Sequence, residues 1–349
     1  MRIAIIAGDG IGKEVTAEAV KVLDAVGEKF GRRFDLEHLP WSADHLLATG
    51  ETMPANGYDL LRSFDAIFIG ALGDPRVPDN RHARDILLGT RFELDLYVNY
   101  RPVRLIDDRL SPLKNRGVKD INFVVFRENT EGVYVSVGGR FKAGTEDEIA
   151  IQEEINTYKG VHRIIRHAFN YAKANGLNKV CMADKSNAMQ QGHALWQRVF
   201  KEVSAQYPGI IATHQYIDAM AMFLVKDPAQ YQVIVTNNLF GDIITDIGGA
   251  LQGGLGMAAS GNLHPGKTSL FEPVHGSAPP LAGKNVANPI GAILSTALML
   301  ETLGARDESK AIEAAVDTAV GEGQTTTDIG GTLGTREAGD FIVKQIRKH

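Results

Sequence analysis

The chain has 349 residues, of which 44% are hydrophobic, and its formal net charge at pH 7 is -5. This length exceeds one ordinary hydrophobic core, so two domains are expected. The acidic balance argues against a nucleic acid or an acidic membrane as the main partner, because both require a basic face. A single cysteine, Cys181, excludes an internal disulfide. We expect a cytoplasmic protein without a signal peptide or a membrane span, and Cys181 as a buried small hydrophobe.

Short apolar segments alternate with longer helical patterns along the chain. Strands are predicted at residues 2–8, 66–70, 121–126, 179–183 and 232–236, and helices at about 13–30, 160–175, 188–205, 288–304 and 308–321. This alternation is the signature of an α/β protein with a largely parallel sheet. Asn288 followed by Pro289 is a good N-cap and first-turn pair for the helix that follows them.

The pattern changes between residues 134 and 159. Glycines at 138 and 139 and a charged stretch precede alternating residues at 149–155. These features predict a protruding two-stranded arm at about 134–160. An isolated hairpin is only marginally stable in water, so we expect the arm to pack on a second subunit.

Three glycines, Gly8, Gly10 and Gly12, follow the first predicted strand. The Rossmann fingerprint requires its third glycine one position later, where Lys13 stands, so the standard dinucleotide-binding motif fails. A tight strand-to-helix turn accounts for the glycines without any ligand. We therefore interpret this turn as part of a different nucleotide-binding fold.

Two carboxylates four residues apart, Asp242 and Asp246, follow the apolar run 233–235. Residues at this spacing share one face of a helix. Convergent carboxylates repel unless a cation lies between them, and all-oxygen ligation favours Mg²⁺ or Mn²⁺ over zinc. The alternative is a solvated helix face. The apolar residues Ile243 and Ile244 beside them favour the metal site.

Four motifs occur in order along the chain: Gly8-Asp9-Gly10-Ile11-Gly12, Arg127-Glu128-Asn129-Thr130-Glu131-Gly132, Asn238-Leu239-Phe240-Gly241-Asp242 and Glu272-Pro273-Val274-His275-Gly276-Ser277-Ala278-Pro279. With these motifs the chain resembles the β-decarboxylating dehydrogenases over essentially its full length. This family includes isopropylmalate, isocitrate, homoisocitrate and tartrate or D-malate dehydrogenases. The chain is most similar to the isopropylmalate branch.

The resemblance implies a two-domain α/β fold of the isopropylmalate/isocitrate dehydrogenase type, distinct from a standard Rossmann fold and carrying a protruding dimer arm. Residues 1–99 plus 252–349 would form a discontinuous cofactor-binding domain. Residues 100–251 would form the domain for substrate, metal and dimerisation. The family's homodimer shares its active sites. Asp218 would therefore reach the substrate and the metal from the other subunit, beside Asp242 and Asp246.

The family's substrate arginines match Arg91, Arg101 and Arg127. A guanidinium pairs bidentately with a carboxylate and keeps its proton. The catalytic lysine matches Lys185 and the catalytic tyrosine matches Tyr134. A neighbouring metal ion and arginines disfavour the ammonium form of a lysine, which suits a base. The implied reaction is metal-dependent oxidative decarboxylation of a 3-substituted malate, in which Lys185 takes the hydroxyl proton and Tyr134 returns a proton to C3.

In this family the helix before the first arginine largely sets substrate choice. Leu87 and Leu88 match an isopropyl group there and favour 3-isopropylmalate, the substrate of a step in leucine biosynthesis. Burial of both leucines in the domain core is the competing interpretation. Arg84 stands where isopropylmalate enzymes often carry an acid, and Gly89-Thr90 is unusual. Isocitrate, homoisocitrate, tartrate or D-malate, and a secondary-metabolite substrate therefore stay open.

A non-catalytic regulatory paralogue is a further alternative. Such chains usually lose a metal aspartate, the lysine or the tyrosine, and this chain keeps all of them. Catalysis is therefore the favoured interpretation.

Eight residues match family positions around the nicotinamide cofactor: Asn187, Glu272, His275, Gly276, Ser277, Ala278, Leu281 and Asn288. NAD-using relatives typically have an aspartate where Pro280 stands, and NADP-using relatives tend to have lysine and tyrosine at positions 280 and 281. This chain has neither feature. We favour NAD because no cation replaces the missing aspartate, with NADP as the alternative.

Overall fold

The computed structural model describes residues 1–348, which fall into two compact units. The first unit comprises Met1–Leu96, Arg101–Ile121 and the chain from Gly249 on, and the second comprises Tyr97–Tyr100 and Asn122–Gly248. The chain passes between the units within one strand, β4 (Val98–Arg104). The expected domain boundaries grouped residues 101–121 with 122–251. In the structure, residues 101–121 belong to the first unit.

The first unit is built on a mixed sheet with the strand order β2-β1-β3-β12-β11. Its strands are β1 (Arg2–Gly8), β2 (Asp35–His38), β3 (Ala66–Ala71), β11 (Ala259–Leu263) and β12 (Ser269–Pro273). β1, β2, β3 and β12 run parallel, with Ile3 opposite Ala66 and Leu270 opposite Ile67. β11 pairs antiparallel with β12. The strands predicted at 2–8 and 66–70 are both present.

Helices cover both faces of this sheet, which is why β1 and β3 are nearly continuous apolar runs. α1 (Gly12–Phe30) and α10 (Ile290–Thr302) pack on one face, and α11 (Arg306–Gly321) and α12 (Thr335–Lys348) pack on these helices. On the other face, Leu61 and Ile86 join a buried cluster with the strand residues Ile67 and Ile69. The sequence patterns did not predict α12.

Shorter helices connect these elements. They are α2 (Ala43–Thr49), α3 (Gly57–Arg62), α4 (Arg81–Ala83), the π-helix η1 (Arg84–Gly89), α5 (Thr90–Glu93) and the 3-10 turns η2 (Asp108–Leu110), η5 (Leu255–Met257), η6 (Pro279–Leu281) and η7 (Thr327–Ile329). Of the helices that the structure describes, none combines the length and the apolar character needed to cross a membrane.

The second unit contains the parallel strands β5-β10-β8-β9 in this order. They are β5 (Asn122–Glu128), β8 (Lys179–Asp184), β9 (Ile211–Tyr216) and β10 (Val233–Thr236). The helices are α6 (Tyr158–Ala174), α7 (Gln190–Ser204), α8 (Ile217–Lys226) and α9 (Asn238–Leu251), with 3-10 turns η3 (Val133–Val135) and η4 (Pro228–Gln230). Cys181 is buried in β8, as predicted, and burial raises its pKa to about 11.

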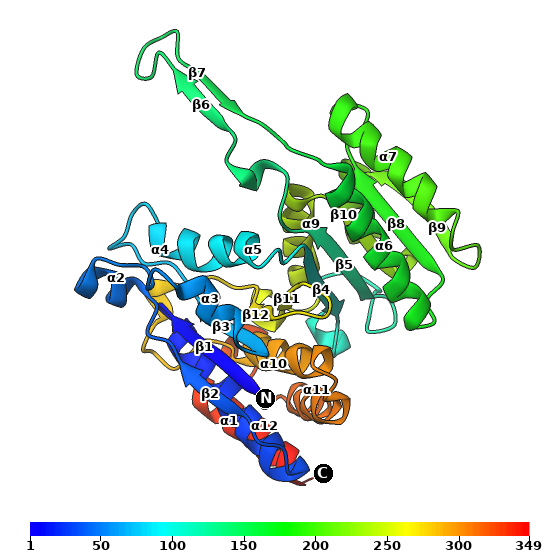
Figure 1. Cartoon of the computed structure of the whole chain (residues 1–349). Coiled ribbons are helices and arrows are strands. Elements are labelled where there is room, and N and C mark those ends of the chain that lie inside the picture. Colours follow the sequence, from blue (N-terminus) through cyan, green and yellow to red (C-terminus); the bar gives the residue numbers. More distant parts are fainter. Residues whose placement is uncertain (349) are drawn as a thin grey trace. The chain divides into compact units, whose positions relative to one another are not determined.

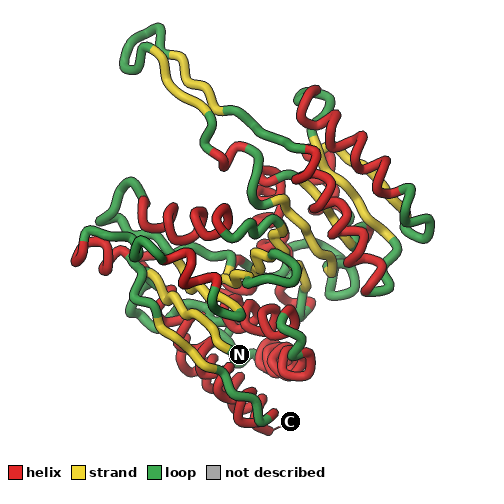
Figure 2. Tube along the Cα trace, viewed as in Figure 1, coloured by secondary structure: helices red, strands yellow, loops and turns green. Residues whose placement is uncertain are grey.

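The predicted two-stranded arm is present. β6 (Gly138–Phe141) and β7 (Ile149–Gln152) pair antiparallel, and Figure 1 shows them projecting from the sheet of their own unit. In Figure 2 the two yellow strands continue into loops that lead back to that sheet. An isolated bridge between Gly132 and Ile155 closes the base of the arm.

One local prediction needs correction. α10 begins at Ile290, so Pro289, and not Asn288, occupies the N-cap position. The side chain of Asn288 still serves the helix start, because its Oδ1 accepts from the Ile290 N–H at 3.0 Å.

Candidate active site

Arg127, Tyr134 and Asp242 form one hydrogen-bonded cluster in the second unit. Arg127 in β5 is opposite Thr236 in β10, so this arginine and the start of α9 lie at the same edge of the sheet. Arg127 Nη1 donates to Asp242 Oδ1 at 2.5 Å, and the Tyr134 hydroxyl donates to Asp242 Oδ2 at 2.9 Å. The guanidinium carbon lies 5.1 Å from the centre of the Tyr134 ring. The structure thus brings together a predicted substrate ligand, the predicted catalytic tyrosine and a predicted metal ligand.

Two residues of the motif before Asp242 hold Arg127 in place. Asn238 Oδ1 accepts from Arg127 Nε and Nη2 at 2.9 and 2.7 Å. Gly241 leaves space for the arginine, because a Cβ at this position would lie 2.5 Å from both Cβ and Cγ of Arg127. Any larger residue at 241 would therefore displace this buried side chain.

Asp246 lies on α9 one turn after Asp242, as the spacing predicts. Asp242 is half-buried and Asp246 is exposed. Two carboxylates on one helix face, with access to solvent, form a donor set that suits a hard divalent cation. In this structure the Asp242 carboxylate is paired with the Arg127 guanidinium.

Lys185 and Asp218 form a second pair in the same unit. Lys185 follows β8, and Asp218 lies in the first turn of α8, directly after β9. Because β8 and β9 are parallel neighbours, both residues lie where the strands end. Lys185 Nζ donates to Asp218 Oδ1 at 2.6 Å, and the ammonium group holds the pKa of Asp218 below its usual value. Asn187, a predicted cofactor contact, is exposed in the loop after Lys185.

The three predicted metal aspartates are not assembled within this chain. Among residues 1–348, no group of three His, Cys, Asp or Glu side chains lies close enough to hold a metal ion. Asp242 belongs to the Arg127 cluster, and Asp218 pairs with Lys185.

Arg91 and Arg101 belong to the first unit, where both are buried. Arg91 in α5 donates through Nη2 to Glu272 Oε1 at 3.0 Å, and Asn262 Nδ2 donates to the same oxygen at 2.9 Å. Arg91 Nε has no hydrogen-bond partner among the described residues. A predicted substrate arginine and a predicted cofactor residue are therefore in direct contact. Arg101 lies in β4.

Leu87 and Leu88 lie in the π-helix η1, directly before α5. Leu87 packs partly against the buried cluster of the first unit, in line with the core interpretation, and Leu88 is half-buried. Thr90 Oγ1 donates to the Ile86 carbonyl at 2.5 Å. π-helical turns are rare overall, but those that occur are often found at functional sites. The sequence flagged this segment as unusual without indicating its helix type.

The predicted cofactor loop follows β12 and rests on the glycine-rich turn. Ile11 N–H donates to the Ser277 carbonyl at 2.8 Å. A Cβ on Gly10 would lie only 2.0 Å from that oxygen, and Gly10 has a φ of +53°. Glu14 accepts from the N–H groups of Gly283 and Asn285 at 2.9 and 3.1 Å. The glycine-rich turn therefore supports the cofactor loop. Its glycine spacing, which does not match the Rossmann fingerprint, did not indicate this role.

Asp9 in the glycine-rich turn connects three segments, and the sequence analysis missed it. This residue is 2% exposed. Its carboxylate accepts from Ala43 N–H and Gly73 N–H at 2.8 and 2.9 Å, and lies 2.8 Å from Nε2 of the buried His82. No local pattern indicates these partners, which come from separate loops.

His275 and Asn288 are two of the predicted cofactor contacts. Burial lowers the pKa of His275, which favours the neutral ring, and its Nε2 has no hydrogen-bond partner among the described residues. Asn288 Nδ2 donates to Asp328 Oδ2 at 3.0 Å, which fixes the orientation of the amide. Ala278 adopts a left-handed φ of 38°, and Ser277 is buried while Gly276 and Leu281 are exposed.

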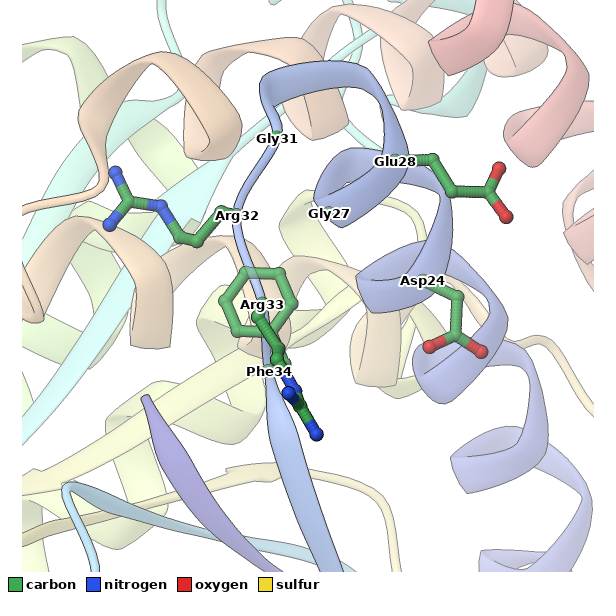
Figure 3. A pocket seen from close by; sticks show the side chains of 7 residues that line it. All are labelled: Asp24, Gly27, Glu28, Gly31, Arg32, Arg33 and Phe34. Atoms are coloured by element: carbon green, nitrogen blue, oxygen red, sulfur yellow. The ribbon is translucent and has the colours of Figure 1, made fainter.

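Two of the surface pockets formed by the described residues lie in the first unit. One, of about 470 Å³, lies between the glycine-rich turn and the cofactor loop and is lined by Asp9, Gly10, Lys13, Glu14, Asp44, Asp74, Pro75, Arg76, Pro279, Ala282 and Gly283. The other, of about 480 Å³, lies at the end of α1. Figure 3 shows Asp24 and Glu28 projecting from one side of α1, while Arg32 of the following loop points the opposite way. This second pocket contains none of the predicted site residues.

Comparisons with known proteins give the family of the chain. The family model described as "Isocitrate/isopropylmalate dehydrogenase" matches residues 2–342. The 3-isopropylmalate dehydrogenase of Thermobifida fusca is 44% identical over 349 residues, covering 99% of this chain and 98% of the relative. That of Corynebacterium jeikeium is 46% identical over 352 residues, covering 99% and 100%. The crystal structure of isocitrate dehydrogenase from Methylococcus capsulatus superposes with a TM-score of 0.90 at 34% identity and covers 99% of both chains. The chain therefore belongs to the isocitrate/isopropylmalate dehydrogenase family.

Proposed function

We propose that this chain catalyses the oxidative decarboxylation of 3-isopropylmalate, with NAD as the hydride acceptor and Mg²⁺ or Mn²⁺ as the metal. The observation that carries the proposal is full-length identity of 44% and 46% to two 3-isopropylmalate dehydrogenases. Lys185, Tyr134 and the three aspartates are all present, so the chain lacks the losses typical of a regulatory paralogue.

Arginines bind the two carboxylates of the substrate. Arg91, Arg101 and Arg127 are each at most 7% exposed, so a carboxylate bound there is shielded from water and its ion pairs are strong. Leu88 contacts the apolar isopropyl group, supported by its half-buried position on η1. Leu87 serves both as a wall of this pocket and as part of the core.

Two side chains move protons in this scheme. Lys185 of the partner subunit takes the proton of the C2 hydroxyl as hydride leaves C2. The C3–carboxylate bond then breaks and CO₂ leaves with its bond electrons remaining on the substrate. Tyr134 gives a proton to C3. The hydrogen bond from Tyr134 to Asp242 holds the phenol beside the proposed metal helix. One proton is taken and one is returned, so the reaction balances with one hydride transferred.

Asp242 and Asp246 of one subunit, with Asp218 of the partner subunit, would hold the divalent metal. The bound metal supplies Lewis acidity at the C2 oxygen, and the bound nicotinamide accepts hydride. Their donor atoms are carboxylate oxygens, which suit Mg²⁺ or Mn²⁺. Arg127 then exchanges part of its contact with Asp242 for a substrate carboxylate.

A homodimer with shared sites completes this set of residues. Within one chain the site residues form two separate groups, Lys185 with Asp218 and Arg127 with Tyr134 and Asp242. A second copy would bring its own Lys185 and Asp218 to the Arg127 group, which supports the proposal. The proposal is also supported by the exposed apolar residues of the arm, Phe141 and Ile151, which a second copy would cover.

NAD is favoured over NADP by the charges around the 470 Å³ pocket beside the cofactor loop. Four carboxylates line it, and both of its cations are already engaged. Lys13 pairs with Asp44 at 2.7 Å, and Arg76 pairs with Asp44 and Asp74 at 2.7 Å each. A 2′-phosphate near this lining would meet net negative charge.

The test is initial-rate measurement with Mg²⁺ on a panel of 3-isopropylmalate, isocitrate, homoisocitrate, D-malate and tartrate, with NAD and NADP in parallel. We expect the highest kcat/KM with 3-isopropylmalate and NAD. A higher value for a tricarboxylate would overturn the substrate assignment and point to Arg84, whose side chain is 68% exposed at the start of η1. No turnover of any acid would support the regulatory-paralogue alternative.

A further inference from the structure

A buried histidine supports the main chain of Lys185. His193 lies in the first turns of α7 and has no exposed surface. Its Nδ1 accepts from the Lys185 backbone N–H at 2.7 Å. The Lys185 carbonyl in turn accepts from the N–H groups of Ala188 and Met189 at 2.9 and 2.8 Å. Both polar groups of the Lys185 main chain are therefore fixed.

The neighbours of His193 determine its tautomer. Because Nδ1 accepts a hydrogen bond, Nε2 carries the ring proton in the neutral form. Nε2 lies 3.2 Å from Glu154 Oε1, to which it donates. Asn237 Nδ2 donates to the same oxygen at 2.6 Å, and Asn237 Oδ1 accepts from the Phe240 N–H at 2.8 Å, which sets the amide orientation.

Glu154 belongs to the base of the arm. It lies two positions after β7 and directly before Ile155, which pairs with Gly132. The next residue, Asn156, accepts from Trp196 Nε1 on α7 at 2.8 Å. The segment 154–156 is thus attached to α7 at two points, one of them through His193.

The alternative is that His193 is only a packed core residue. Aromatic packing alone would account for its edge contact with Phe240, whose ring centre lies 5.5 Å away. Packing does not require a directional acceptor at 2.7 Å from the Lys185 N–H, or a carboxylate with an exposed fraction of only 11% on the opposite ring nitrogen. This pattern of a carboxylate fixing one ring nitrogen while the other contacts a functional group is the way proteins orient histidines.

We propose that His193 is a positioning residue for Lys185, and that Glu154 fixes the His193 tautomer and ties the lysine loop to the base of the arm. The inference rests on the proposed role of Lys185 as the base. A displacement of about 1 Å at a reacting group costs on the order of 10²-fold in rate, so loss of this support should lower kcat.

Two amide variants separate the two ring nitrogens. His193→Asn keeps an acceptor near the position of Nδ1 and loses the contact with Glu154. His193→Gln keeps a donor near the position of Nε2 and loses the contact with Lys185. His167→Gln is the control, because His167 is a half-buried histidine of the same unit that packs edge-on to Phe126 and, among the described residues, forms no hydrogen bond with a predicted site residue.

Three quantities are measured on the full-length protein: kcat and KM for the best substrate of the panel, the thermal midpoint, and amide hydrogen exchange of the peptide that contains Lys185. We expect His193→Gln to lower kcat about 10- to 100-fold with KM changed less than about 3-fold, and to accelerate exchange at Lys185. His193→Asn should keep kcat within about 5-fold of the parent and preserve the protection. His167→Gln should change only the thermal midpoint.

Equal losses of kcat in the two His193 variants, or unchanged exchange in His193→Gln, would overturn the positioning role and leave packing as the explanation. The exchange measurement needs no turnover. If the parent protein is inactive on every acid, the proposed function fails while the hydrogen bond from Lys185 to His193 is still tested by exchange.

Discussion

Arg91 Nη2 and Glu272 Oε1 lie 3.0 Å apart and form a buried ion pair, with side chains only 7% and 11% exposed. The pair joins α5 to β12 across 181 positions of sequence. In the proposed function it connects the substrate arginine with a residue at the nicotinamide ribose. Each charge offsets the cost of burying the other inside the first unit.

Replacing Glu272 by alanine would leave the Arg91 charge buried and unpaired. We expect the free energy of unfolding to fall by about 3–5 kcal/mol, as measured by chemical denaturation. Glu93→Ala is the matched control, because Glu93 pairs with Arg62 at 3.4 Å and both side chains are about half-exposed. The control should cost no more than about 1 kcal/mol. Equal losses in both variants would contradict the stabilising role of the buried pair.

Glu128 should make stability depend on pH. Burial, with a smaller contribution from Glu131, raises the pKa of Glu128 to about 7 from 4.5. The folded protein therefore holds a proton that the unfolded chain releases between these values, and this stabilising contribution is lost as pH rises towards 7. The free energy of unfolding should fall by about 3 kcal/mol over this pH range. Denaturation from about pH 5 to about pH 8 should show the decline, and Glu128→Gln should flatten it. A parent curve that rises over this interval would refute the assignment.

Tyr134→Phe removes the proposed proton donor and keeps the ring beside Arg127. We expect kcat to fall about 10²- to 10⁴-fold, the usual range for loss of an acid–base group. Tyr158→Phe is the control, because Tyr158 is exposed and its hydroxyl donates to Glu202 Oε2 at 3.3 Å on the surface of the second unit. Turnover of Tyr134→Phe at the parental rate would exclude Tyr134 as the donor.

Asp246→Asn should weaken metal binding without destabilising the fold, since Asp246 is exposed on α9. We expect Mg²⁺ or Mn²⁺ affinity, measured by calorimetry on the assembled protein, to fall by more than about 10-fold. A chelator should abolish turnover of the parent, and added Mg²⁺ should restore it. Asp59→Asn, a change at an exposed position of α3, should leave metal affinity unaltered. Unchanged metal affinity in Asp246→Asn would remove this residue from the proposed ligand set.

Leu88→Ala should reduce kcat/KM for 3-isopropylmalate by about 10- to 100-fold, because apolar contacts of this size contribute about 1–3 kcal/mol. D-malate, which lacks the isopropyl group, should lose much less. Leu87→Ala should also lower the thermal midpoint, because Leu87 packs against the buried cluster of the first unit. Equal losses on both substrates for Leu88→Ala would place the isopropyl group elsewhere.

The sequence alone determined the alternating α/β pattern, the helix that carries Asp242 and Asp246, and the failure of the Rossmann spacing at Lys13. These features depend on local periodicity and on turn chemistry, which a few neighbouring residues specify. The family motifs added candidate roles for Arg127, Tyr134 and Lys185. The same local patterns did not predict β9, α8 or α12, and they placed the N-cap of α10 at Asn288, whereas the structure has it at Pro289.

Only the tertiary structure determined which of these residues touch. Three sets of contacts join residues that are distant in sequence or lie on different elements. They are the Arg91–Glu272 pair, the hydrogen bond from the Lys185 N–H to His193, and the contacts of Asp9 with three segments. Their distances depend on strand register and on helix packing, which no local pattern encodes. The physical reason is that a buried polar group needs partners, and the packed fold alone sets which groups are close enough to be those partners.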